Sequence, residues 1–378
     1  MRVCVIGAGP AGLYAAILIR RARPDIDITV YEQNPADATW GFGVVFSDQA
    51  LAFLRKDDPA TADLIEPHLR CWSNIAVNHR GQHIVIDGIG FSAISRLGLL
   101  RLLQRRAGAL GIAVEFTSRI DTIDDITADL IIGADGLNSV VRASADFGED
   151  IRYLSNRFVW YGAEREFDAL TQTFIDTEFG PMNAHHYAYA PGQATFIIEM
   201  PGEVFARTGF ADLPEPDYRR MCERCFAETL QGAPLIANNS LWRQFPQLTC
   251  QRWSSGNRVL VGDALHTAHF SIGSGTRLAL EDVIALVNAL QDSDWHVAAA
   301  LQAYQTERRP ILDKLVRAAG QSAQWYEDFP RHMQLAPWPF ALSYIQRGGR
   351  IDAARLRDLA PRFAGELEAR GIAPEAQP

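Results

Sequence analysis

The chain has 378 residues, of which 48% are hydrophobic and 21% are charged, as in an ordinary globular protein. Its length exceeds what one hydrophobic core usually serves, so we expect two or three structural regions. The formal net charge of −9 argues against a nucleic-acid binder, because such proteins need cations to neutralise phosphates.

The first dozen residues predict a nucleotide-binding turn between a strand and a helix. Arg2–Ile6 is a short β-branched run, and Leu13–Arg21 is expected to be helical. The glycines between them follow the G-x-G-x-x-G spacing. In it the first glycine makes a tight turn, the second lets a pyrophosphate approach and the third lets the helix pack on the strand. Free N–H groups and the helix dipole would favour a phosphate there. The expected binding residues of this turn are Gly7, Gly9, Pro10, Ala11 and Gly12.

The second strand is expected over Asp27–Glu32 and ends in an acid. Glu32 follows the glycine turn by about 20 residues, where a carboxylate would accept hydrogen bonds from both ribose hydroxyls of an adenosine. It would also repel a 2′-phosphate, so FAD or NAD is favoured over NADP. We include the neighbouring Gln33 in this site. The alternative is a surface glutamate at a strand end.

Residues Thr39–Asp48 are rich in glycine and aromatic side chains, and we expect them to form a loop leading into Gln49–Arg55. Two glycines among aromatic residues favour backbone packed close to a flat ligand, and a tight loop over the sheet is the alternative. The alternation over Asn74–Asp87 predicts a hairpin around Arg80-Gly81.

An amphipathic helix is expected from Ile94 onward, followed by a strand over Gly111–Phe116. Arg96 lies in the first turn of this helix, where it could reach a phosphate or a ribose. A solvated arginine is the alternative.

Ala128–Arg142 predicts a further strand, a tight turn and a helix start. Asp135-Gly136 supplies the turn, Ser139 could cap the helix and Arg142 would anchor the turn. Residues 157–200 then contain aromatic, β-rich runs separated by glycine and proline, which predict a mostly antiparallel sheet.

Cys222 and Cys225 have the C-x-x-C spacing, but neither a second pair nor a nearby histidine completes a metal site. We interpret them as two residues on one face of a helix and expect no metal. The five scattered cysteines are typical of a reducing compartment. No segment approaches the roughly 20 apolar residues of a membrane span. We therefore expect a cytoplasmic protein that does not bind membranes.

A strand beginning near residue 257 enters Gly262-Asp263, and a glycine-rich turn then feeds a helix over Arg277–Leu290. Backbone N–H groups at this second helix start would again face an electron-rich ligand. Asp263 is therefore interpreted as a ligand contact rather than a surface carboxylate. The chain from about residue 297 is expected to be helical.

The glycine turn at the N-terminus, the Asp135-Gly136 turn and the Gly262-Asp263 turn follow one another along the chain. Together they resemble the motifs of the single-component FAD-dependent aromatic hydroxylases (group A, of the p-hydroxybenzoate hydroxylase fold). Segments 40–48 and 266–275 are also similar to a subgroup acting on bulky aromatic substrates. It includes the salicylyl-CoA 5-hydroxylases, the 2-aminobenzoyl-CoA monooxygenase/reductases and the tryptophan-derivative hydroxylase of violacein biosynthesis. One departure stands out: where the wider group usually has proline before the flavin-facing glycines, this chain has His269 and Phe270. The motifs are Gly7-x-Gly9-x-x-Gly12, Asp135-Gly136-x-x-Ser139-x-x-Arg142 and Gly262-Asp263-Ala264.

The resemblance implies an α/β fold in which a Rossmann-like FAD-binding domain is interleaved with a mostly antiparallel β-sheet substrate domain. The discontinuous FAD-binding domain would comprise 1–73, 92–150 and 255–295. The substrate domain would comprise 74–91 and 151–254, with a C-terminal helical region over 296–378. The molecule would be a monomer or a homodimer.

The resemblance also implies the chemistry. NADH or NADPH would reduce a non-covalently bound FAD, and O2 would then form a flavin C4a-hydroperoxide that an electron-rich aromatic ring attacks. FAD would lie along the first glycine turn, with Glu32 at the adenosine ribose and Asp263 near the ribityl–pyrophosphate region. Arg96 matches the family's helix-start arginine. The second turn would stabilise negative charge on the reduced flavin through Gly273, Ser274, Gly275 and Thr276.

His269 is the candidate catalytic residue, because a neutral imidazole can act as a base near neutral pH; structural packing beside Phe270 is the alternative. Phe270 is a candidate substrate contact. Strand alternation allows only some of the candidate aromatic walls to face the substrate, and these are Trp160, Tyr161, Tyr187 and Tyr189.

The preferred function is hydroxylation of an aromatic acyl-CoA such as salicylyl-CoA. The alternatives are a free aromatic acid, a tryptophan- or indole-derived substrate, or an FAD-dependent reductase of the same fold. A halogenase would carry a W-x-W-x-I-P signature, which the chain lacks. A plain NAD-dependent dehydrogenase would leave Asp135-Gly136 and Gly262-Asp263 without a role, and a non-catalytic nucleotide-binding module would not need the second glycine loop.

Overall fold

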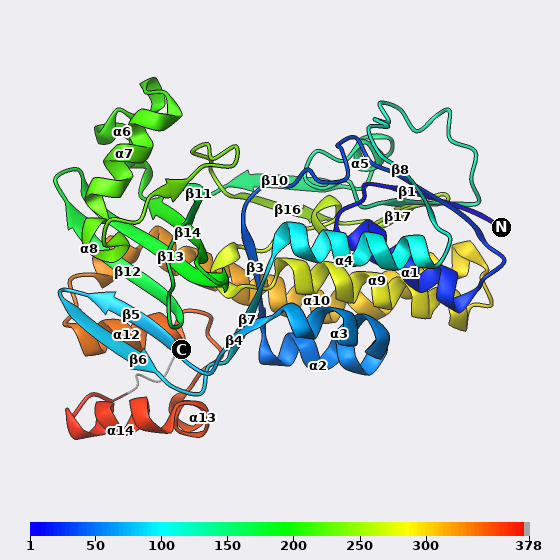
Figure 1. The fold of residues 1–378 in the computed structure, drawn as a ribbon. Helices are drawn as coiled ribbons and strands as arrows, with labels where there is room; N and C mark the ends of the chain where they lie inside the picture. Colours follow the sequence, from blue (N-terminus) through cyan, green and yellow to red (C-terminus); the bar gives the residue numbers. More distant parts are fainter. Residues whose placement is uncertain (374–378) are drawn as a thin grey trace.

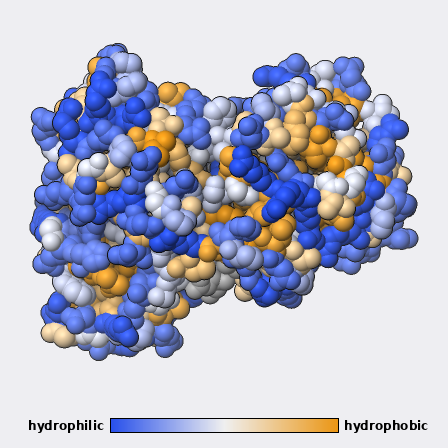
Figure 2. Space-filling model, in the orientation of Figure 1, coloured by the Kyte–Doolittle hydropathy of each residue, from blue (hydrophilic) through white to orange (hydrophobic). Residues whose placement is uncertain are grey.

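A computed structural model describes residues 1–373, and for residues 48–51 the backbone alone. The last five residues of the expected C-terminal region, 374–378, lie outside the described residues. Figure 2 shows two lobes joined by a narrower middle, where hydrophobic side chains reach the surface among hydrophilic ones.

The N-terminal glycine turn belongs to a six-stranded sheet with the order β17-β18-β9-β1-β2-β8. Strands β18, β9, β1, β2 and β8 run parallel, and β17 is antiparallel at the edge. From β1 the chain first adds β2 and β8 on one side of the sheet, and later β9 and β18 on the other side. Open parallel α/β sheets bind ligands at such a switch point, beyond the carboxyl ends of the strands. The strands are β1 (Arg2–Ile6), β2 (Asp27–Tyr31), β8 (Ala113–Glu115), β9 (Leu130–Gly133), β17 (Ser254–Ser255) and β18 (Arg258–Leu260).

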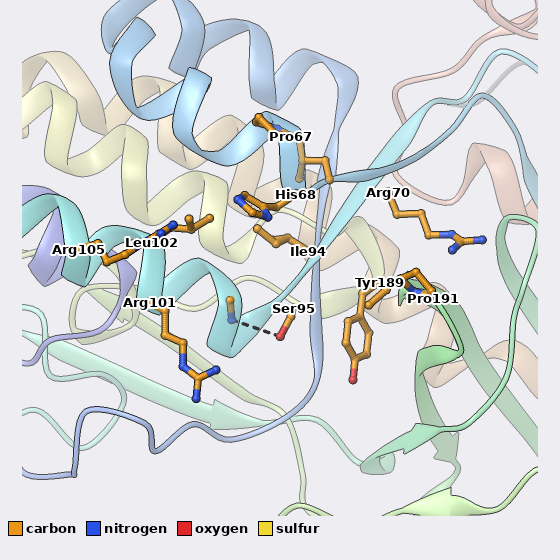
Figure 3. A pocket seen from close by; sticks show the side chains of 13 residues that line it. Pro67, His68, Arg70, Ile94, Ser95, Arg101, Leu102, Arg105, Tyr189 and Pro191 are labelled. Atoms are coloured by element: carbon orange, nitrogen blue, oxygen red, sulfur yellow. Dashed lines mark hydrogen bonds between the residues drawn. The ribbon is translucent and has the colours of Figure 1, made fainter.

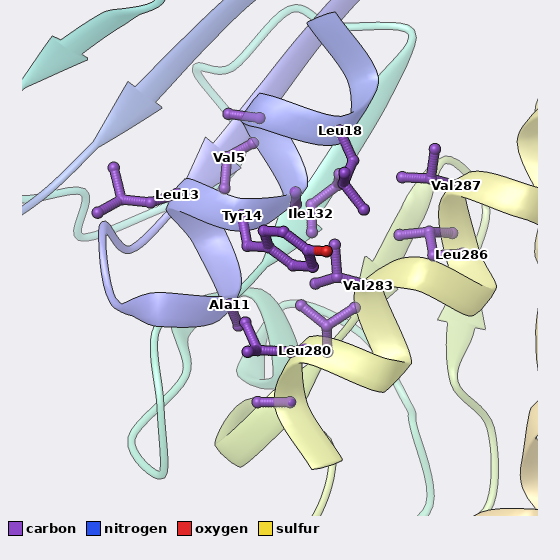
Figure 4. Close-up of a cluster of buried hydrophobic side chains, with 14 of the residues drawn as sticks. Val5, Ala11, Leu13, Tyr14, Leu18, Ile132, Leu280, Val283, Leu286 and Val287 are labelled. Carbon is purple, nitrogen blue, oxygen red and sulfur yellow. The ribbon is translucent and has the colours of Figure 1, made fainter. Parts of the chain in front are cut away.

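Four helices lie side by side against this sheet (Figure 1): α4, α1, α9 and α10. Figure 4 shows Tyr14 of α1 wedged between sheet residues such as Val5 and Ile132 and the α9 side chains Leu280 and Val283. This contact places the N-termini of α1 and α9 near each other at the ligand-binding end of the sheet. The helices are α1 (Pro10–Ala22), α4 (Arg96–Ala109), α9 (Gly275–Asp292) and α10 (Val297–Glu327). A short helix, α5 (Val140–Ala143), follows β9.

The second lobe is built on a seven-stranded sheet with the order β15-β11-β14-β13-β12-β5-β6. Every neighbouring pair is antiparallel except β12–β5, in agreement with the mostly antiparallel sheet expected from the sequence. The predicted hairpin is present as β5 and β6. The strands are β5 (Ile75–His79), β6 (Gln82–Ile86), β11 (Arg157–Ala163), β12 (Leu170–Thr177), β13 (Gly180–Ala190), β14 (Gln193–Met200) and β15 (Leu235–Ile236).

The two faces of this sheet have different partners. One face packs on α6 (Gly202–Thr208), α7 (Glu215–Cys225) and α8 (Ala227–Leu230), together with the turn η2 (Phe210–Asp212). The other face packs on the C-terminal helices at one end and points toward the parallel sheet at the other. Those helices are α11 (Phe329–His332), α12 (Pro337–Gln346), α13 (Ala353–Leu359) and α14 (Pro361–Ala369).

A small antiparallel sheet, β3-β7-β4, lies between the lobes beside helices α2 and α3. Here the expectation of a loop over Thr39–Asp48 was wrong in part. Gly43–Ser47 form strand β3, because Val44, Val45 and Phe46 pair with β7. The elements are β3 (Gly43–Ser47), α2 (Asp48–Asp57), α3 (Pro59–Ile65), η1 (Glu66–His68), β4 (Arg70–Trp72) and β7 (Phe91–Ser95).

A two-stranded ribbon of β10 (Glu149–Tyr153) and β16 (Pro246–Cys250) also connects the lobes. Leu248 and Trp253, expected in the substrate domain, pack in the core of the parallel sheet. The domain boundaries given above stay predictions. No helix within residues 1–373 combines the length and apolarity needed to cross a bilayer.

Candidate active site

The first glycine turn has the shape of a phosphate cradle. Gly7 has φ +97°, and a β-carbon there would lie 2.4 Å from the Ala134 carbonyl oxygen. A β-carbon at Gly12 would lie 1.9 Å from the Gly7 carbonyl oxygen. The equivalent position at Gly9 has no atom within 4 Å, so this glycine opens to free space directly before α1. The second glycine is therefore the one that a ligand can approach.

Glu32 lies under this turn at the end of β2. One carboxylate oxygen accepts a hydrogen bond from the Ala8 N–H at 2.8 Å, and the other accepts from the Asn34 N–H at 2.9 Å. The carboxylate is thus fixed beside the turn, in a position suited to an adenosine ribose. The neighbouring Gln33 is exposed.

The second glycine loop meets the first at Gly262. A β-carbon at Gly262 would lie 3.1 Å from the Ala279 β-carbon and 3.4 Å from that of Ala11. The helices α1 and α9 therefore converge on this residue, where the tight Ala279 contact and a φ of +58° both favour glycine. Two glycine motifs separated by most of the chain lie together in the folded molecule.

Asp263 follows in the turn η3 (Gly262–Ala264) and keeps an open side toward solvent. Protein atoms nevertheless surround it closely enough that burial raises the pKa of its carboxyl, while His266 and Arg96 lower it. Burial lowers the pKa of the Arg96 guanidinium, and Asp263 raises it. The Arg96 Nε atom is buried and has no hydrogen-bond partner among the described residues. The Arg96 guanidinium suits a negatively charged group of a ligand, and the Asp263 carboxylate suits a hydroxyl donor.

A buried network that the sequence did not reveal holds this loop in place. Asp282 of α9 accepts hydrogen bonds from the Gly262 N–H at 3.2 Å and from Arg308 Nε of α10 at 3.0 Å, and its Oδ2 lies 2.7 Å from His266 Nε2. The pKa of Asp282 is lowered, because its charged partners outweigh the effect of burial. The sequence offered one signal of this network. Asp282 occupies a position of the predicted helix that the apolar periodicity places on the buried face, where an apolar residue would be expected.

The Asp135-Gly136 turn is tied to the same loop. Arg142 donates to the Ala264 carbonyl at 2.8 Å and also to the Leu137 carbonyl, so it anchors the turn as expected. Ser139 caps α5 by accepting from the Arg142 N–H at 2.9 Å. Asp135 accepts from the Val140 N–H at 2.7 Å, while its other oxygen is buried without a partner in the described chain.

The start of α9 is shaped by close packing on β3 and β7. A β-carbon at Gly273 would lie 2.8 Å from Val45 and 3.4 Å from Phe91. Gly275, the first residue of α9, has no atom within 4 Å of that position. The first N–H groups of a helix lack partners within it, so Gly275 and Thr276 present free donors beside open space, with Ser274 before them.

The aromatic candidates divide between the two faces of the seven-stranded sheet. The Trp160 ring lies against Gly41, and the Tyr187 hydroxyl donates to the Gly43 carbonyl at 2.8 Å. Both therefore lie on the face of the sheet that packs on residues 41–43. Tyr161 points to the opposite face, where it is 0% exposed in the cluster with Tyr218. The structure thus separates Tyr161 from the other candidates, because neighbouring residues of a strand point to opposite faces.

His269 is buried, with 3% of its surface exposed. Its Nδ1 accepts from the Ser271 N–H at 3.4 Å and lies 2.8 Å from the Ser271 hydroxyl, and its Nε2 lies 4.0 Å from the Glu199 carboxylate. Burial lowers the pKa of His269 to about 4, so the ring is neutral at pH 7. His185 belongs to the same polar cluster, 3.5 Å from Glu199. Phe270 packs against the His269 ring and begins the turn η4 (Phe270–Ile272).

Together these features fit FAD. Gly9 leaves room for a pyrophosphate, Glu32 is fixed beside the turn, Arg96 has a buried Nε without a partner among the described residues, and Asp263 is exposed. Among the residues that the structure describes, no cluster of metal-ligating side chains is present, and the C-x-x-C pair lies at the end of α7.

Comparison with known proteins agrees with the fit of this site to FAD. A family model described as an FAD binding domain matches residues 106–319, and one described as an NAD(P)-binding Rossmann-like domain matches residues 5–38. Salicyloyl-CoA 5-hydroxylase of Streptomyces sp. is 37% identical over 95% of this chain and 72% of its own length.

Two further relatives are similar over nearly their whole length. A 3-hydroxy-4-methyl-anthranilyl-[aryl-carrier protein] 5-monooxygenase of Streptosporangium sibiricum is 36% identical over 98% of this chain and 100% of its own. Protodeoxyviolaceinate monooxygenase of Chromobacterium violaceum is 30% identical over 92% and 94%.

Two solved structures share the fold at low sequence identity. A 2-methyl-3-hydroxypyridine-5-carboxylic acid oxygenase superposes with a TM-score of 0.69 at 18% identity, covering 97% of both chains. P. aeruginosa PqsL in complex with 2-aminobenzoylacetate superposes with a TM-score of 0.68 at 20% identity, covering 88% of this chain and 98% of its own.

Proposed function

The chain belongs to the family of FAD-binding aromatic monooxygenases, and from this premise we propose that it hydroxylates an aromatic ring presented as an acyl thioester. The preferred substrate is an aromatic acyl-CoA such as salicylyl-CoA, with NADH or NADPH and O2 as co-substrates. The observation that carries the proposal is the convergence of the two glycine turns at Gly262, in a loop that continues to Gly273 against Val45 of β3, the strand whose Gly43 carbonyl accepts from Tyr187. A cofactor held by both turns would reach that strand.

In this proposal FAD spans the two turns. The flavin supplies the activation of oxygen that amino-acid side chains cannot perform, and the chain supplies binding, orientation and exclusion of water. Free N–H groups at the start of α9 favour negative charge at that end of the cofactor. The residues that would hold it are Gly7, Gly9, Pro10, Ala11, Gly12, Glu32, Gln33, Arg96, Asp263, Gly273, Ser274, Gly275 and Thr276.

Trp160, Tyr187 and Phe270 would form the substrate-facing wall. The role of His269 can be narrowed, because both of its ring nitrogens are directed at protein groups, Ser271 and Glu199. These contacts favour a positioning role, in which His269 holds the turn that carries Phe270. They disfavour a role as the base that takes a proton from the aromatic substrate.

A pH profile separates the two roles of His269. If His269 is the base, His269→Gln loses most of kcat at every pH and also loses the acidic limb of the pH profile. If it positions the turn, the acidic limb stays, kcat falls modestly and more reduced cofactor is oxidised without product. Single-turnover product yield measured by mass spectrometry distinguishes them.

The substrate proposal is tested by comparing salicylate, salicylyl-CoA, 2-aminobenzoyl-CoA and an indolic carboxylic acid in one assay. We expect the purified protein to be yellow, and we expect the thioesters to give coupled NAD(P)H oxidation and a product 16 Da heavier, the mass of the inserted oxygen atom. Colourless protein that takes up no added FAD contradicts the proposal. Product from only the free acid or the indole rejects the thioester preference.

The indolic alternative has support of its own, since protodeoxyviolaceinate monooxygenase is 30% identical over most of both chains. In that case the indolic arm of the comparison gives the highest kcat/KM. A product that has gained two hydrogens and no oxygen favours a reductase of the same fold.

A further inference from the structure

A groove of about 730 Å³ opens on the outside of the molecule where α4, β4 and the end of β13 meet (Figure 3). None of the residues assigned above to FAD lines it, and of the candidate aromatic walls Tyr189 alone does. Figure 3 shows Arg101 and Arg105 on one side of the groove and Arg70 on the other, with Tyr189 between them. Its volume lies in the range typical of small-molecule sites.

The mouth of the groove is cationic in a chain whose net charge is −9. Arg101 and Arg105 are exposed one turn apart on α4, and neither forms an ion pair with a described residue. Like charges at this spacing repel each other along a helix. Arg70 faces them while paired with Glu166 at 2.6 Å. Arginine binds phosphate through two parallel hydrogen bonds, so a phosphate at this mouth would relieve the repulsion.

The floor of the groove is apolar. It is formed by Ile94 of β7, Leu102 of α4, the Tyr189 ring and Pro191. A ligand that fits both parts has a long, mostly apolar arm and ends in a phosphate.

The groove also adjoins the aromatic face of the proposed active site. A β-carbon at Gly43 would lie 2.6 Å from the Tyr189 ring, and Gly43 pairs with Ser95, which lines the groove. The Gly43 carbonyl accepts the hydrogen bond from Tyr187. Gly43 at the start of β3 therefore contacts both the groove, through Tyr189, and the substrate-facing wall, through Tyr187.

We propose that this groove binds the phosphopantetheine arm of an aromatic acyl thioester, with its phosphate between Arg101 and Arg105 and its arm along Ile94 and Tyr189. The inference rests on the proposed thioester substrate and extends it. Coenzyme A and a carrier protein both present this arm, and the two relatives most similar in sequence above are named for one of each.

The test compares the double variant Arg101→Ala/Arg105→Ala with wild type. The matched control is Arg317→Ala, which removes an exposed, unpaired helical arginine of α10 outside the groove. We expect KM for the acyl-CoA to rise at least tenfold in the double variant and to stay unchanged in the control. KM for the corresponding acyl-pantetheine, which lacks the phosphate, should be the same in all three proteins, as should FAD content and KM for NADH.

The remaining outcomes each decide the proposal. An unchanged KM for acyl-CoA in the double variant overturns it while leaving the thioester function standing. A raised KM for NADH or NADPH alone assigns the groove to the nicotinamide nucleotide and also overturns it. A higher kcat/KM for the acyl-carrier protein than for acyl-CoA identifies a protein-bound source of the arm, and the double variant should then lose that activity instead.

If no thioester is hydroxylated, the proposed function fails, and calorimetry with free coenzyme A and free phosphopantetheine still tests the groove. Binding that the double variant weakens at least tenfold supports the site. Absence of binding to the wild type overturns it.

Discussion

Asp282 is the residue on which the second glycine loop depends most. It is 0% exposed and contacts the Gly262 backbone, His266 and Arg308 at once. Buried charges are tolerated only when their partners satisfy them. The loop that would face the flavin is thus held by an ion-pair network in addition to its apolar packing.

Replacing Asp282 by alanine should destabilise the fold by about 3 kcal/mol, because a buried ion pair is broken, although Arg308 keeps Glu281 as a carboxylate partner at 2.9 Å. Urea unfolding with saturating FAD measures the loss of stability. Retention of FAD on a desalting column measures whether the second glycine loop still holds the cofactor. The control is Asp313→Ala, which removes an exposed carboxylate 3.8 Å from Arg309 and should cost less than about 1 kcal/mol. Equal losses in the two variants would contradict the role given to Asp282.

Three buried histidines make the stability of the protein depend on pH. Burial lowers the pKa of His185 and His186 to about 3 and that of His269 to about 4, whereas the unfolded value is about 6.5. Below about pH 6.5 these histidines are protonated in the unfolded state but stay neutral in the folded state. Stability is therefore fully present above about pH 6.5 and falls toward pH 4, by up to about 1.4 kcal/mol per pH unit for each histidine.

The free energy of unfolding should accordingly drop between pH 7 and pH 5. His269→Gln should show a shallower slope than wild type over that interval, measured by urea titration at each pH. His83→Gln is the control, because the His83 side chain is exposed and lies outside the buried histidine cluster. A slope that His269→Gln leaves unchanged would show that this histidine takes up its proton in the folded protein.

At the scale of elements, the first strand, turn and helix could be read from the sequence because their signal is local. β1 spans Arg2–Ile6 as expected, and α1 begins at Pro10, three residues before the predicted start, since proline suits the first turn of a helix. Strand β3 was missed because its pairing with β7 joins segments distant in sequence. Strand alternation predicts that Trp160 and Tyr161 point to opposite faces of the sheet. Which of them faces residues 41–43 is decided by the packing of α7, whose Tyr218 shares a core with Tyr161.

The contrast between Gly9 and Gly12 gives an element-scale prediction. Gly9→Ala adds a methyl group into open space and should change the stability of the apoprotein by less than about 1 kcal/mol, the usual range at a helix N-cap. FAD affinity should nevertheless fall at least tenfold, because the methyl group occupies the place of the pyrophosphate.

Gly108→Ala, an exposed position of α4 that is equally open, is the control and should leave FAD affinity unchanged. Flavin fluorescence quenching measures the affinity and thermal unfolding the stability. Wild-type affinity in Gly9→Ala would remove the first glycine turn from the cofactor site. Gly12→Ala should instead lose the fold, since its methyl group would collide with the Gly7 carbonyl.

At the scale of the whole molecule, α10 ties the lobes together. Its 31 residues span about 46 Å at 1.5 Å per residue. Leu301 and Tyr304 pack in the core of the parallel sheet, and Trp325 and Tyr326 pack in the core beside the antiparallel sheet. A helix was predictable here from periodicity, but its contact with two cores was not. We expect a single unfolding transition in calorimetry, whereas two separate transitions would mean that the lobes unfold independently.

The convergence of two distant glycine loops also bears on how the protein is made. Gly262 follows Gly12 by 250 residues, which at 5–20 residues per second is about 10 to 50 s of translation. Throughout that interval the nascent α1 lacks α9, so the Tyr14 ring has no Leu280 or Val283 to cover it. A growing chain in this condition exposes apolar surface that chaperones bind. Free FAD could close the site only after the ribosome has passed α9, so flavin supply should govern yield late in synthesis.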